Sequence, residues 1–458
     1  MINFKKLMMI GLAMATMPTF AQNPIIRNQF SADPTARVFN GKIYLYPSHD
    51  IPPASAEDFP RKDWFCMEDY HVFSSENMTE WTDHGKIFDQ KQVPWGKPDA
   101  YSMWAPDCIE KDGKYYFYFP DAPKTGFGFG IGVAVADNPE GPYTVLDKNI
   151  EGISGIDPCV LQASDGNSYI FWGAGRCAKL KDNMIELAED TPTEIVKFGD
   201  REFKMTGVNC LNGLPSRQAE GPFAFEYNGN YYLTYPYVRN NTEVIGYAMS
   251  KNPMGPYEYK GLILEEWPDC WTIHQSVVNY KGQWYLFYHH NNYSPNFDKS
   301  RSACVDSLFF NPDGTIQQVK PTLRGVGINK ATEKIQIDRY SSISDGASIS
   351  YLYENNADTT KRFEGWKTTF AKAGSYVQYN RVDFEQGAAK VIINYKSAKG
   401  GKVTISDLKG NVITEVKLKG NNQFTEQTFP VKNSPKGICD LKITAQTQDI
   451  EIDWISFK

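Results

Sequence analysis

The sequence predicts an all-β protein, in which a five-bladed β-propeller precedes a smaller β-sandwich of the jelly-roll type. Three patterns predict this architecture: a glycine turn with an aromatic strand recurs five times, a second hairpin follows several of these strands, and the aromatic repeat ends near Arg324. An internal repeat of roughly fifty to seventy residues, with several short strands per unit, is typical of a propeller.

Each propeller unit is marked by a glycine turn that leads into a strand rich in tyrosine, phenylalanine or tryptophan. The five turn-and-strand segments are residues 40–46, 112–118, 166–172, 228–235 and 281–288. Residues 130–143 and 245–257 share a further pattern, in which a strand is followed by an Asn-Pro pair and a Gly-Pro pair that form outer turns. We therefore expect each unit to continue into a second hairpin and to form one blade.

Changes of pattern divide the 458 residues into four segments. Lys5, Lys6, the apolar run 7–17 and Ala21 predict a signal peptide at residues 1–21, whose apolar part is too short to span a bilayer. The propeller is expected at 22–325, a linker at 326–334 and the sandwich at 335–458. Short runs separated by Gly, Asn and Lys turns predict the sandwich strands at 376–384, 390–395, 402–406, 441–444 and 450–457.

The bulk composition narrows the class of partner. A net charge of −6 without a dense Lys/Arg stripe argues against nucleic acid and against insertion into a membrane. The predicted signal peptide implies export, to the periplasm or the extracellular space. The eight cysteines have no metal-finger spacing, and most of them are expected to be free and buried. The oligomeric state is left open.

Five polar residues precede the five turns at a similar spacing, namely Asp33, Asp107, Asp157, Glu220 and His274. The innermost strands of a propeller meet at one axis, so these side chains are expected to converge. Asp33, Asp157 and Glu220 each have a proline one or two residues later, which fixes the backbone beside the acid. A single Asp-Pro is more often an ordinary turn. Three acids in register with a repeat instead favour a catalytic role, because cleavage of a glycosidic bond needs a carboxylic acid and a carboxylate base.

These motifs resemble those of glycoside hydrolase family 43, the five-bladed propeller enzymes that act on arabinose- and xylose-containing glycans. The resemblance covers about residues 23–325 and rests on Ser31-Ala32-Asp33-Pro34, Gly155-Ile156-Asp157-Pro158 and Glu220-Gly221-Pro222. It implies inversion at the anomeric carbon, with Asp33 activating water and Glu220 protonating the departing oxygen. Asp157 would keep Glu220 protonated and oriented.

The same resemblance implies roles for residues that line the sugar pocket. Trp104, in Met103-Trp104-Ala105-Pro106-Asp107, is similar to a tryptophan that stacks on the sugar, with core packing as the alternative, and Asp107 is expected to be structural. Arg301 resembles an arginine that reaches the site from the last blade and keeps the base ionised, with an exposed rim arginine as the alternative. Trp271 lies in one of the loops that could wall a pocket, as do Trp64, Phe65 and Trp95.

His274 matches the position where many members of the family hold a hydrated calcium ion on the propeller axis. Calcium prefers oxygen ligands, so one imidazole could be only a partner, directly or through water. A hydrogen-bonded core histidine is the alternative. No organic cofactor is implied.

From about Ala331 the chain resembles a family 6 carbohydrate-binding module, through residues 374–379 and 452–455. Trp366 is the predicted sugar platform of this module, whereas Trp454 is expected in its core. Residues 335–340 depart from the usual acidic pair, which leaves the module's structural calcium in doubt. Weak glycan binding and a purely supporting role beside the propeller both remain open.

The sequence thus predicts an exported inverting glycoside hydrolase that releases α-L-arabinofuranosyl or β-D-xylosyl units. The expected substrates are plant cell-wall polysaccharides (arabinan, arabinoxylan, xylan) or their oligosaccharides, and an arabinofuranosidase is slightly favoured over a β-xylosidase. The alternatives are an endo-acting arabinanase or xylanase and a non-catalytic glycan-binding propeller. The presence of all three acids argues against the second alternative.

Overall fold

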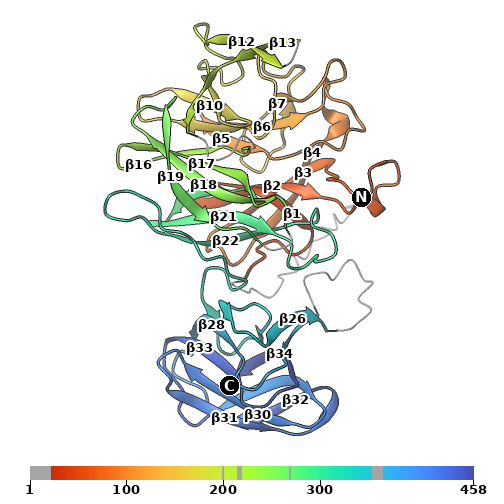
Figure 1. The fold of residues 1–458 in the computed structure, drawn as a ribbon, viewed down its shortest axis with the longest axis vertical. Coiled ribbons are helices and arrows are strands. Elements are labelled where there is room, and N and C mark those ends of the chain that lie inside the picture. The colour runs from red at the N-terminus through yellow and green to blue at the C-terminus, as the bar shows by residue number, and fades with distance from the viewer. Residues whose placement is uncertain (1–21, 199–200, 214–218, 268–269, 353–364) are drawn as a thin grey trace, which may run out of the picture.

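The computed structural model describes residues 22–198, 201–213, 219–267, 270–352 and 365–458, so the predicted signal peptide lies outside it. Over these ranges the fold is all-β, as predicted, with two short 3-10 turns, η1 (Pro53–Ser55) and η2 (Gln90–Gln92), and no α-helix. Consequently these ranges contain no helix long and apolar enough to cross a membrane. Figure 1 shows a large lobe formed by the first two thirds of the chain and a smaller lobe at the C-terminal end.

The large lobe contains five antiparallel sheets that follow one another along the chain, and the predicted aromatic segments supply the second strand of each. The first sheet is β1 (Phe30–Phe39), β2 (Lys42–Asp50), β3 (Asp69–Ser75) and β4 (Thr82–Asp89), and the second is β5 (Asp107–Lys111), β6 (Lys114–Asp121), β7 (Gly130–Ala136) and β8 (Thr144–Val145). The third is β9 (Cys159–Gln162), β10 (Ser168–Trp172), β11 (Arg176–Lys179) and β14 (Val208–Asn209). The fourth is β16 (Phe223–Tyr227), β17 (Asn230–Arg239), β18 (Thr242–Ser250) and β19 (Tyr257–Leu264), with the parallel β15 (Leu211–Asn212) at its edge. The fifth is β20 (Ser276–Tyr280), β21 (Gln283–His290) and β22 (Ser302–Leu308). A separate hairpin, β12 (Thr193–Phe198) and β13 (Arg201–Thr206), is inserted after the third sheet.

The first strands of the five sheets lie side by side. β5 contacts β1 and β9, β16 contacts β9 and β20, and β20 in turn contacts β1. Hydrogen bonds tie these neighbours together: the Thr35 hydroxyl donates to the Pro106 carbonyl at 2.8 Å, and the Ser276 hydroxyl donates to the Pro34 carbonyl at 2.6 Å. Residues distant in the sequence are therefore brought to one centre.

The aromatic strands fill the space between sheets. The rings of Tyr46 and Tyr70 in the first sheet lie 5.8 and 4.9 Å from that of Phe117 in the second, in edge-to-face contacts. All three side chains are almost completely buried, and such pairs add to the stabilisation from buried area. This packing explains why tyrosine and phenylalanine recur at the same positions of the repeat.

The small lobe is a sandwich of two six-stranded sheets around one apolar core. One sheet holds β23 (Asn329–Lys330), β25 (Ser342–Ile343), β28 (Tyr376–Asp383), β30 (Gly401–Asp407), β31 (Val412–Leu418) and β33 (Ile438–Ala445). The other holds β24 (Ile335–Gln336), β26 (Ala347–Tyr351), β27 (Trp366–Phe370), β29 (Lys390–Ser397), β32 (Asn421–Pro430) and β34 (Ile450–Phe457). The five predicted strands are all present.

The predicted linker is partly incorporated into the sandwich. Within residues 326–334, β23 pairs with β28, and Ala331 is buried in the core of the small lobe. The segment therefore begins the small lobe rather than forming a free tether. All eight cysteines lie in the described ranges and are free, and all except the half-buried Cys439 are buried, in agreement with the prediction.

The two lobes are joined through a buried interface centred on Tyr293, which lies between β21 and β22. Its hydroxyl donates to Asp338 at 3.3 Å, and the Arg339 guanidinium lies 3.8 Å from its ring centroid. Trp366 packs edge-to-face on the same ring, with centroids 4.8 Å apart, and only 3% of it is exposed. The structure therefore does not support Trp366 as a sugar platform, because its ring faces the other lobe instead of solvent.

We expect Trp366→Ala to destabilise the protein by about 3–5 kcal/mol, since it removes a large buried ring and leaves a cavity. The measurement is thermal or urea unfolding of the mature chain. Leu408→Ala is the matched control, because Leu408 is an apolar side chain of the same lobe with 44% exposure. An unchanged unfolding midpoint for Trp366→Ala would contradict the interface described above.

Candidate active site

The five predicted centre-facing residues all lie at or just before the first strand of a sheet. Asp33 is within β1, where the pairing register shifts between Ala32 and Thr35, and Asp107 opens β5. Asp157, Glu220 and His274 stand two or three residues before β9, β16 and β20. Asp33 and Asp157 adopt φ values of +47° and +58°, which are uncommon for residues other than glycine and are often found at functional sites.

Asp33 is a buried carboxylate held in its ionised form. Arg301 Nη1 donates to Oδ1 at 2.9 Å, and the Ser48 hydroxyl donates to Oδ2 at 2.6 Å. Burial by itself would raise the pKa of Asp33, but Arg301, together with His274, His289 and the Ser48 hydrogen bond, lowers it to about 2. Asp33 is therefore a proton acceptor at neutral pH.

Asp157 and Glu220 have the opposite character. Asp157 is buried, and its Oδ2 accepts the backbone N–H of Gly221 at 3.1 Å, which connects it directly to the Glu220 segment. Burial and the charges of Glu220 and Asp33 raise the pKa of Asp157 well above its usual value. Burial and the charge of Asp33 also raise the pKa of Glu220, and the charge of Arg301 reduces this rise in part. The three acids lie close enough to influence one another, and they divide into one whose pKa is lowered and two whose pKa values are raised.

Gly221 allows this arrangement to form. Its φ is +53°, and a Cβ at this position would lie 2.8 Å from the His274 ring. Because a larger residue would collide with the imidazole, glycine is required directly after Glu220. The Glu-Gly-Pro motif thus has a steric reason as well as a chemical one.

Two acidic residues that the sequence analysis did not single out belong to the same cluster. Asp50 accepts both the Arg301 Nε and Nη2 at 2.9 Å, so Arg301 bridges Asp50 and Asp33. Glu243 is buried, hydrogen-bonds the Glu220 carboxyl, and accepts the Ile273 N–H at 2.9 Å. Burial and Glu220 raise the pKa of Glu243 well above its usual value, so the Glu220–Glu243 pair retains at least one proton.

Arg301 is buried, with 3% exposure, and it is not the exposed rim arginine of the alternative. Its two carboxylate partners satisfy the guanidinium and fix it beside Asp33. Asp107 has a different role, because Arg37 donates to both of its oxygens at 2.9 and 2.6 Å and the Val160 N–H donates to it at 2.6 Å. Asp107 thus ties β1 to β9, as expected of a structural residue.

Aromatic side chains form a continuous wall beside Arg301. The Arg301 guanidinium lies 4.8 Å from the Phe65 ring centroid, and Phe65 contacts both Trp271 at 6.2 Å and Trp104 at 6.3 Å between centroids. Trp271 is 42% exposed and Trp104 is half-buried. The structure thus brings Trp104, Arg301 and Trp271 together through Phe65, whereas Trp95 packs on Phe119. Flat apolar rings beside hydrogen-bonding groups are suited to holding a sugar.

His274 is buried, and its Nδ1 lies 3.9 Å from Asp33 Oδ1. Burial lowers the pKa of His274, which keeps the imidazole neutral and able to coordinate a cation. The adjacent Gln275 donates through Nε2 to the Gly221 carbonyl, but its buried Oε1 accepts no hydrogen bond from the described residues. The neutral imidazole of His274 and the unpartnered amide oxygen of Gln275 are two groups that could accompany a hydrated cation, and the calcium ion itself stays a prediction.

A second group could hold a metal ion. His49, Asp69 and His71, on β2 and β3, have ligand atoms within 4.8 Å of one another. Two imidazoles and one carboxylate suit a transition metal better than calcium, so this group does not carry the calcium prediction. The 2.6 Å hydrogen bond between His49 Nδ1 and Asp69 Oδ1 accounts for the pair without an ion.

Comparison with known proteins decides the family. The sequence profile of glycosyl hydrolases family 43 matches residues 21–316. The chain belongs to this family. A second profile, of the family 6 carbohydrate-binding modules, matches residues 327–458, so both resemblances seen in the sequence are confirmed. This family 43 protein is accordingly a glycoside hydrolase with a C-terminal module.

Several relatives of this family 43 enzyme are closely similar over the large lobe. Xylosidase/arabinosidase 43A of Humicola insolens is 36% identical over 336 residues, which cover 65% of this chain and 99% of the relative. A beta-xylosidase of Xylanibacter ruminicola is 35% identical and covers 65% of this chain and 98% of the relative. A similar solved structure is the crystal structure of a beta-xylosidase/alpha-arabinofuranosidase from a compost microbial metagenome, in complex with xylotriose and in a calcium-free form. It is 33% identical in sequence, its TM-score is 0.56, and the match covers 66% of this chain and 98% of that chain.

One solved structure matches this family 43 enzyme over both lobes. An arabinoxylan arabinofuranohydrolase of Bacillus subtilis covers 96% of this chain and 99% of that chain, with a TM-score of 0.51 and 22% identity. At this identity the match shows that the two proteins share a fold.

Proposed function

We propose that the protein is an inverting, exo-acting glycoside hydrolase that releases β-D-xylosyl and α-L-arabinofuranosyl units from xylan, arabinoxylan, arabinan or their oligosaccharides. The observation that carries the proposal is that three clustered acids have pKa values shifted in opposite directions. Asp33 has a pKa lowered to about 2, whereas Asp157 and Glu220 have raised pKa values. A base that is ionised and an acid that is protonated at the same pH are what glycoside hydrolysis requires.

In the proposed reaction, Asp33 removes a proton from a water molecule as the water oxygen bonds to the anomeric carbon. The bond between that carbon and the glycosidic oxygen breaks, and Glu220 gives its proton to the departing oxygen. Asp157 accepts the backbone N–H of Gly221, which orients the Glu220 segment, and in its ionised form its charge would favour the protonated form of Glu220. Arg301 orients Asp33 and keeps it ionised.

The substrate class follows from the site and from the relatives. The H. insolens and X. ruminicola relatives are a xylosidase/arabinosidase and a beta-xylosidase. Trp104 and Trp271, which both contact the buried Phe65, supply the ring surfaces on which a pentose could stack beside Arg301. Both sugars are neutral pentoses, so one pocket of this kind accommodates either.

The five sheets with their neighbouring first strands support a five-bladed propeller at residues 22–325, each sheet being one blade. We place the carbohydrate-binding module after it and retain export through the signal peptide at residues 1–21 as part of the proposal. His274 and Gln275 would hold a calcium ion near the centre, where its positive charge would favour the ionised form of Asp33.

Aryl glycosides test the proposed function. The mature chain should release 4-nitrophenol from 4-nitrophenyl β-D-xylopyranoside or α-L-arabinofuranoside, and proton NMR of the first product should show the anomer opposite to that of the substrate. Release of the same anomer would exclude inversion. Absence of turnover on either glycoside and on xylo-oligosaccharides would favour a glycan-binding protein.

The pH dependence of kcat/KM should reflect the two opposite pKa shifts. Because Glu220 acts in its protonated form, activity on xylobiose is expected below its raised pKa and is lost as the pH rises through that value. Asp33 stays ionised down to about pH 2, so it should not limit activity under mildly acidic conditions. A dinitrophenyl xyloside, whose leaving group needs no proton, should show a weaker alkaline loss. An identical alkaline loss for both substrates would contradict Glu220 as the acid.

A further inference from the structure

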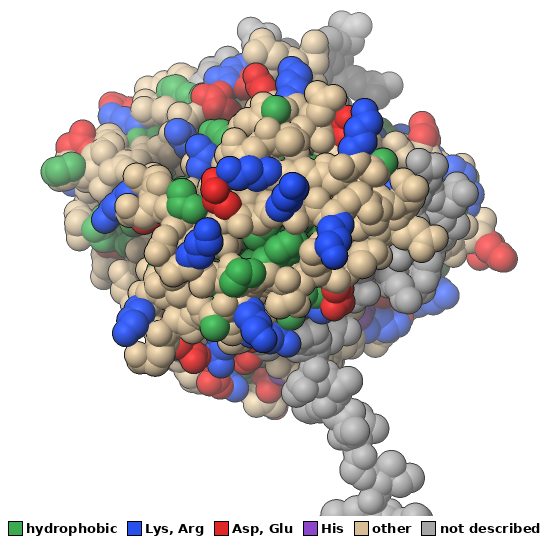
Figure 2. All heavy atoms as spheres, turned by 90° about the horizontal axis from the view of Figure 1, so that it is seen from below, with side chains coloured by type: hydrophobic (Ala, Val, Ile, Leu, Met, Phe, Trp, Pro, Cys, Tyr) green, Lys and Arg blue, Asp and Glu red, His purple; other side chains and the backbone are tan. Residues whose placement is uncertain are grey.

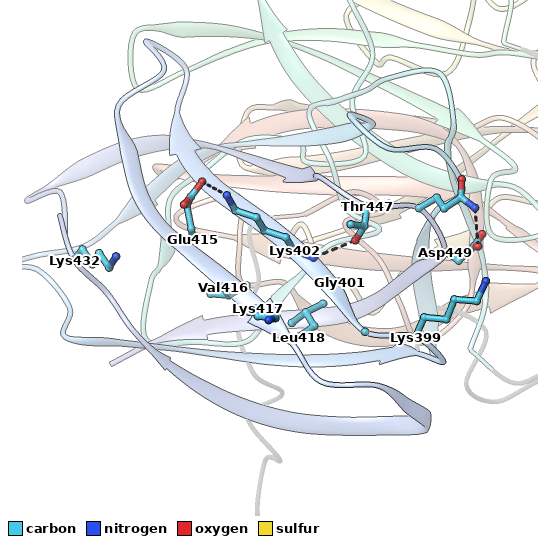
Figure 3. A pocket seen from close by; sticks show the side chains of 12 residues that line it. Lys399, Gly401, Lys402, Glu415, Val416, Lys417, Leu418, Lys432, Thr447 and Asp449 are labelled. Atoms are coloured by element: carbon cyan, nitrogen blue, oxygen red, sulfur yellow. Dashed lines mark hydrogen bonds and ion pairs between the residues drawn. The ribbon is translucent and has the colours of Figure 1, made fainter.

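A hollow of about 690 Å³ lies on the small lobe, at the end farthest from the large lobe (Figures 1 and 3). It is formed by β30 and β31 and by the turns that precede β30 and β34. Its lining residues are Lys399, Gly400, Gly401, Lys402, Glu415, Val416, Lys417, Leu418, Lys432, Thr447, Gln448 and Asp449. None of the residues that form the catalytic cluster takes part, so the hollow is a separate feature.

The hollow is rich in positive charge. Four of its lining residues are lysines and two are acids. The excess extends beyond the lining, because residues 390–458 contain eleven lysines and seven acidic residues, in a chain whose net charge is −6. Figure 2 views this end of the molecule and shows Lys and Arg side chains spread around a region in which hydrophobic side chains are visible. The C-terminal part of the small lobe is thus enriched in lysine.

Most of this positive charge is not neutralised within the protein. Lys402 Nζ pairs with Glu415 at 2.8 Å, and Asp449 accepts a hydrogen bond from Gln448. Among the described residues, Lys399, Lys417 and Lys432 form no ion pair, and all three are exposed. Three unpaired ammonium groups therefore line one hollow beside a single unpaired carboxylate, Asp449, and this excess of positive charge favours an anionic ligand.

The other lining residues limit the kind of anion. Thr447 and Gln448 contribute exposed polar side chains, whereas the side chains of Val416 and Leu418 are 1% and 3% exposed and belong to the core of the small lobe, and the lining has no aromatic ring. A neutral glycan is usually held by stacking on aromatic rings, and single-stranded nucleic acid likewise needs rings on which its bases stack. Recognition here must therefore come from charge and hydrogen bonds rather than from stacking.

We propose that this hollow binds a carboxylate-bearing glycan, a chain that contains uronic acid units. The ammonium groups of Lys399, Lys417 and Lys432 pair with the carboxylates, and the exposed side chains of Thr447 and Gln448 hydrogen-bond the sugar hydroxyls. Because the hollow is remote from Asp33 and Glu220, the enzyme can remain attached to an acidic polysaccharide while its catalytic site is open. This inference goes beyond the proposed function and does not depend on it.

Affinity electrophoresis of the mature full-length chain tests the proposal. The probes are polygalacturonate, its fully methyl-esterified form, neutral arabinoxylan and dextran sulfate. The methyl ester keeps the sugar backbone and removes the charge, so binding should be strong to polygalacturonate and weak to its ester. Because the pairs are exposed, affinity should fall as salt rises above 0.15 M, where the Debye length is about 8 Å.

The test variant is the triple substitution Lys399→Gln, Lys417→Gln and Lys432→Gln. We expect it to weaken binding of polygalacturonate by about tenfold or more, with hydrolysis of the aryl glycosides unchanged. The matched control is Lys390→Gln, Lys409→Gln and Lys436→Gln, which removes the same charge from exposed positions of the same lobe outside the hollow. The control should retain most of the binding.

The outcomes separate this proposal from its competitors. Equal loss of binding in the two triple variants would overturn it, because net charge rather than the hollow would then be responsible. Equal binding to dextran sulfate and polygalacturonate would show that the hollow binds any polyanion. This result would also overturn the proposal of a carboxylate-bearing glycan. Equal binding to the methyl ester would show that charge is not recognised. Failure of catalysis alone would leave these binding results unaffected, so the two proposals fail independently.

Discussion

Replacing Glu220 by glutamine is expected to lower kcat on xylobiose by about 10³-fold, while activity on 2,4-dinitrophenyl β-D-xylopyranoside falls much less. The reason is that general acid catalysis contributes about 10²–10⁴-fold to the departure of a sugar oxygen, which must be protonated as it leaves. Dinitrophenolate is stable as an anion and departs without that proton. The measurement is kcat and kcat/KM for both substrates at the pH optimum of the unmodified enzyme.

Glu258→Gln is the matched control for this variant. The substitution is the same as at position 220, and Glu258 lies on β19, in the same sheet as Glu243. Unlike Glu220, Glu258 is exposed, and it pairs only with Lys260 among the described residues. It should have normal activity on both substrates. A Glu220→Gln enzyme that loses activity equally on both would point to damage in the pocket, and one with full activity on xylobiose would remove Glu220 from the reaction.

The position of Glu220 could be predicted from the sequence because it occupies the same place in its repeat unit as Asp33 and Asp157 do in theirs. Asp33, Asp157 and Glu220 each lie at the entry to the first strand of a sheet, and the aromatic turn that follows marks the same point in every unit. Equivalent positions in successive repeat units lie around one axis, so residues far apart in the sequence can be expected to lie close together. The same reasoning placed Asp107 and His274 in the ring, and hydrogen bonds then decided their different roles.

The partners of these acids could not be predicted in this way. Asp50 ends the second strand of the first sheet, and Glu243 lies near the start of β18, so neither occupies the repeated position. Their significance depends on side-chain contacts across sheets, with Arg301 in one case and Glu220 in the other. Such contacts leave no periodic signal in the sequence.

The small lobe shows a related limit. β32 was not predicted, because its sequence Asn421–Pro430 has few apolar residues and most of its side chains are exposed. It is the last strand of its sheet and pairs with β29 alone, so no buried face imposes an apolar alternation. The sequence favours a sugar-binding role for Trp366 for a similar reason, since nothing in it shows that the other lobe covers this ring.

Asp33→Asn is expected to reduce kcat by about 10²–10⁴-fold on both xylobiose and the dinitrophenyl xyloside. The base activates water, and this step is needed whatever the leaving group, so the loss should not depend on the substrate as it does for Glu220→Gln. The fold should survive, because Arg301 keeps Asp50 as a buried partner and the Ser48 hydroxyl can accept a hydrogen bond from the new amide. Affinity for xylobiose, measured by calorimetry, should therefore be retained.

The comparison of the two variants on two substrates is more informative than either variant alone. A base variant that loses activity on both substrates, beside an acid variant that loses it mainly on xylobiose, would assign the two roles without reference to any relative. Asp112→Asn is the control, because it makes the same change of side chain at an exposed position in the turn between β5 and β6. If Asp33→Asn instead unfolds the enzyme at a temperature where the control is stable, Asp33 is a structural partner of Arg301, and the base must be sought elsewhere in the cluster.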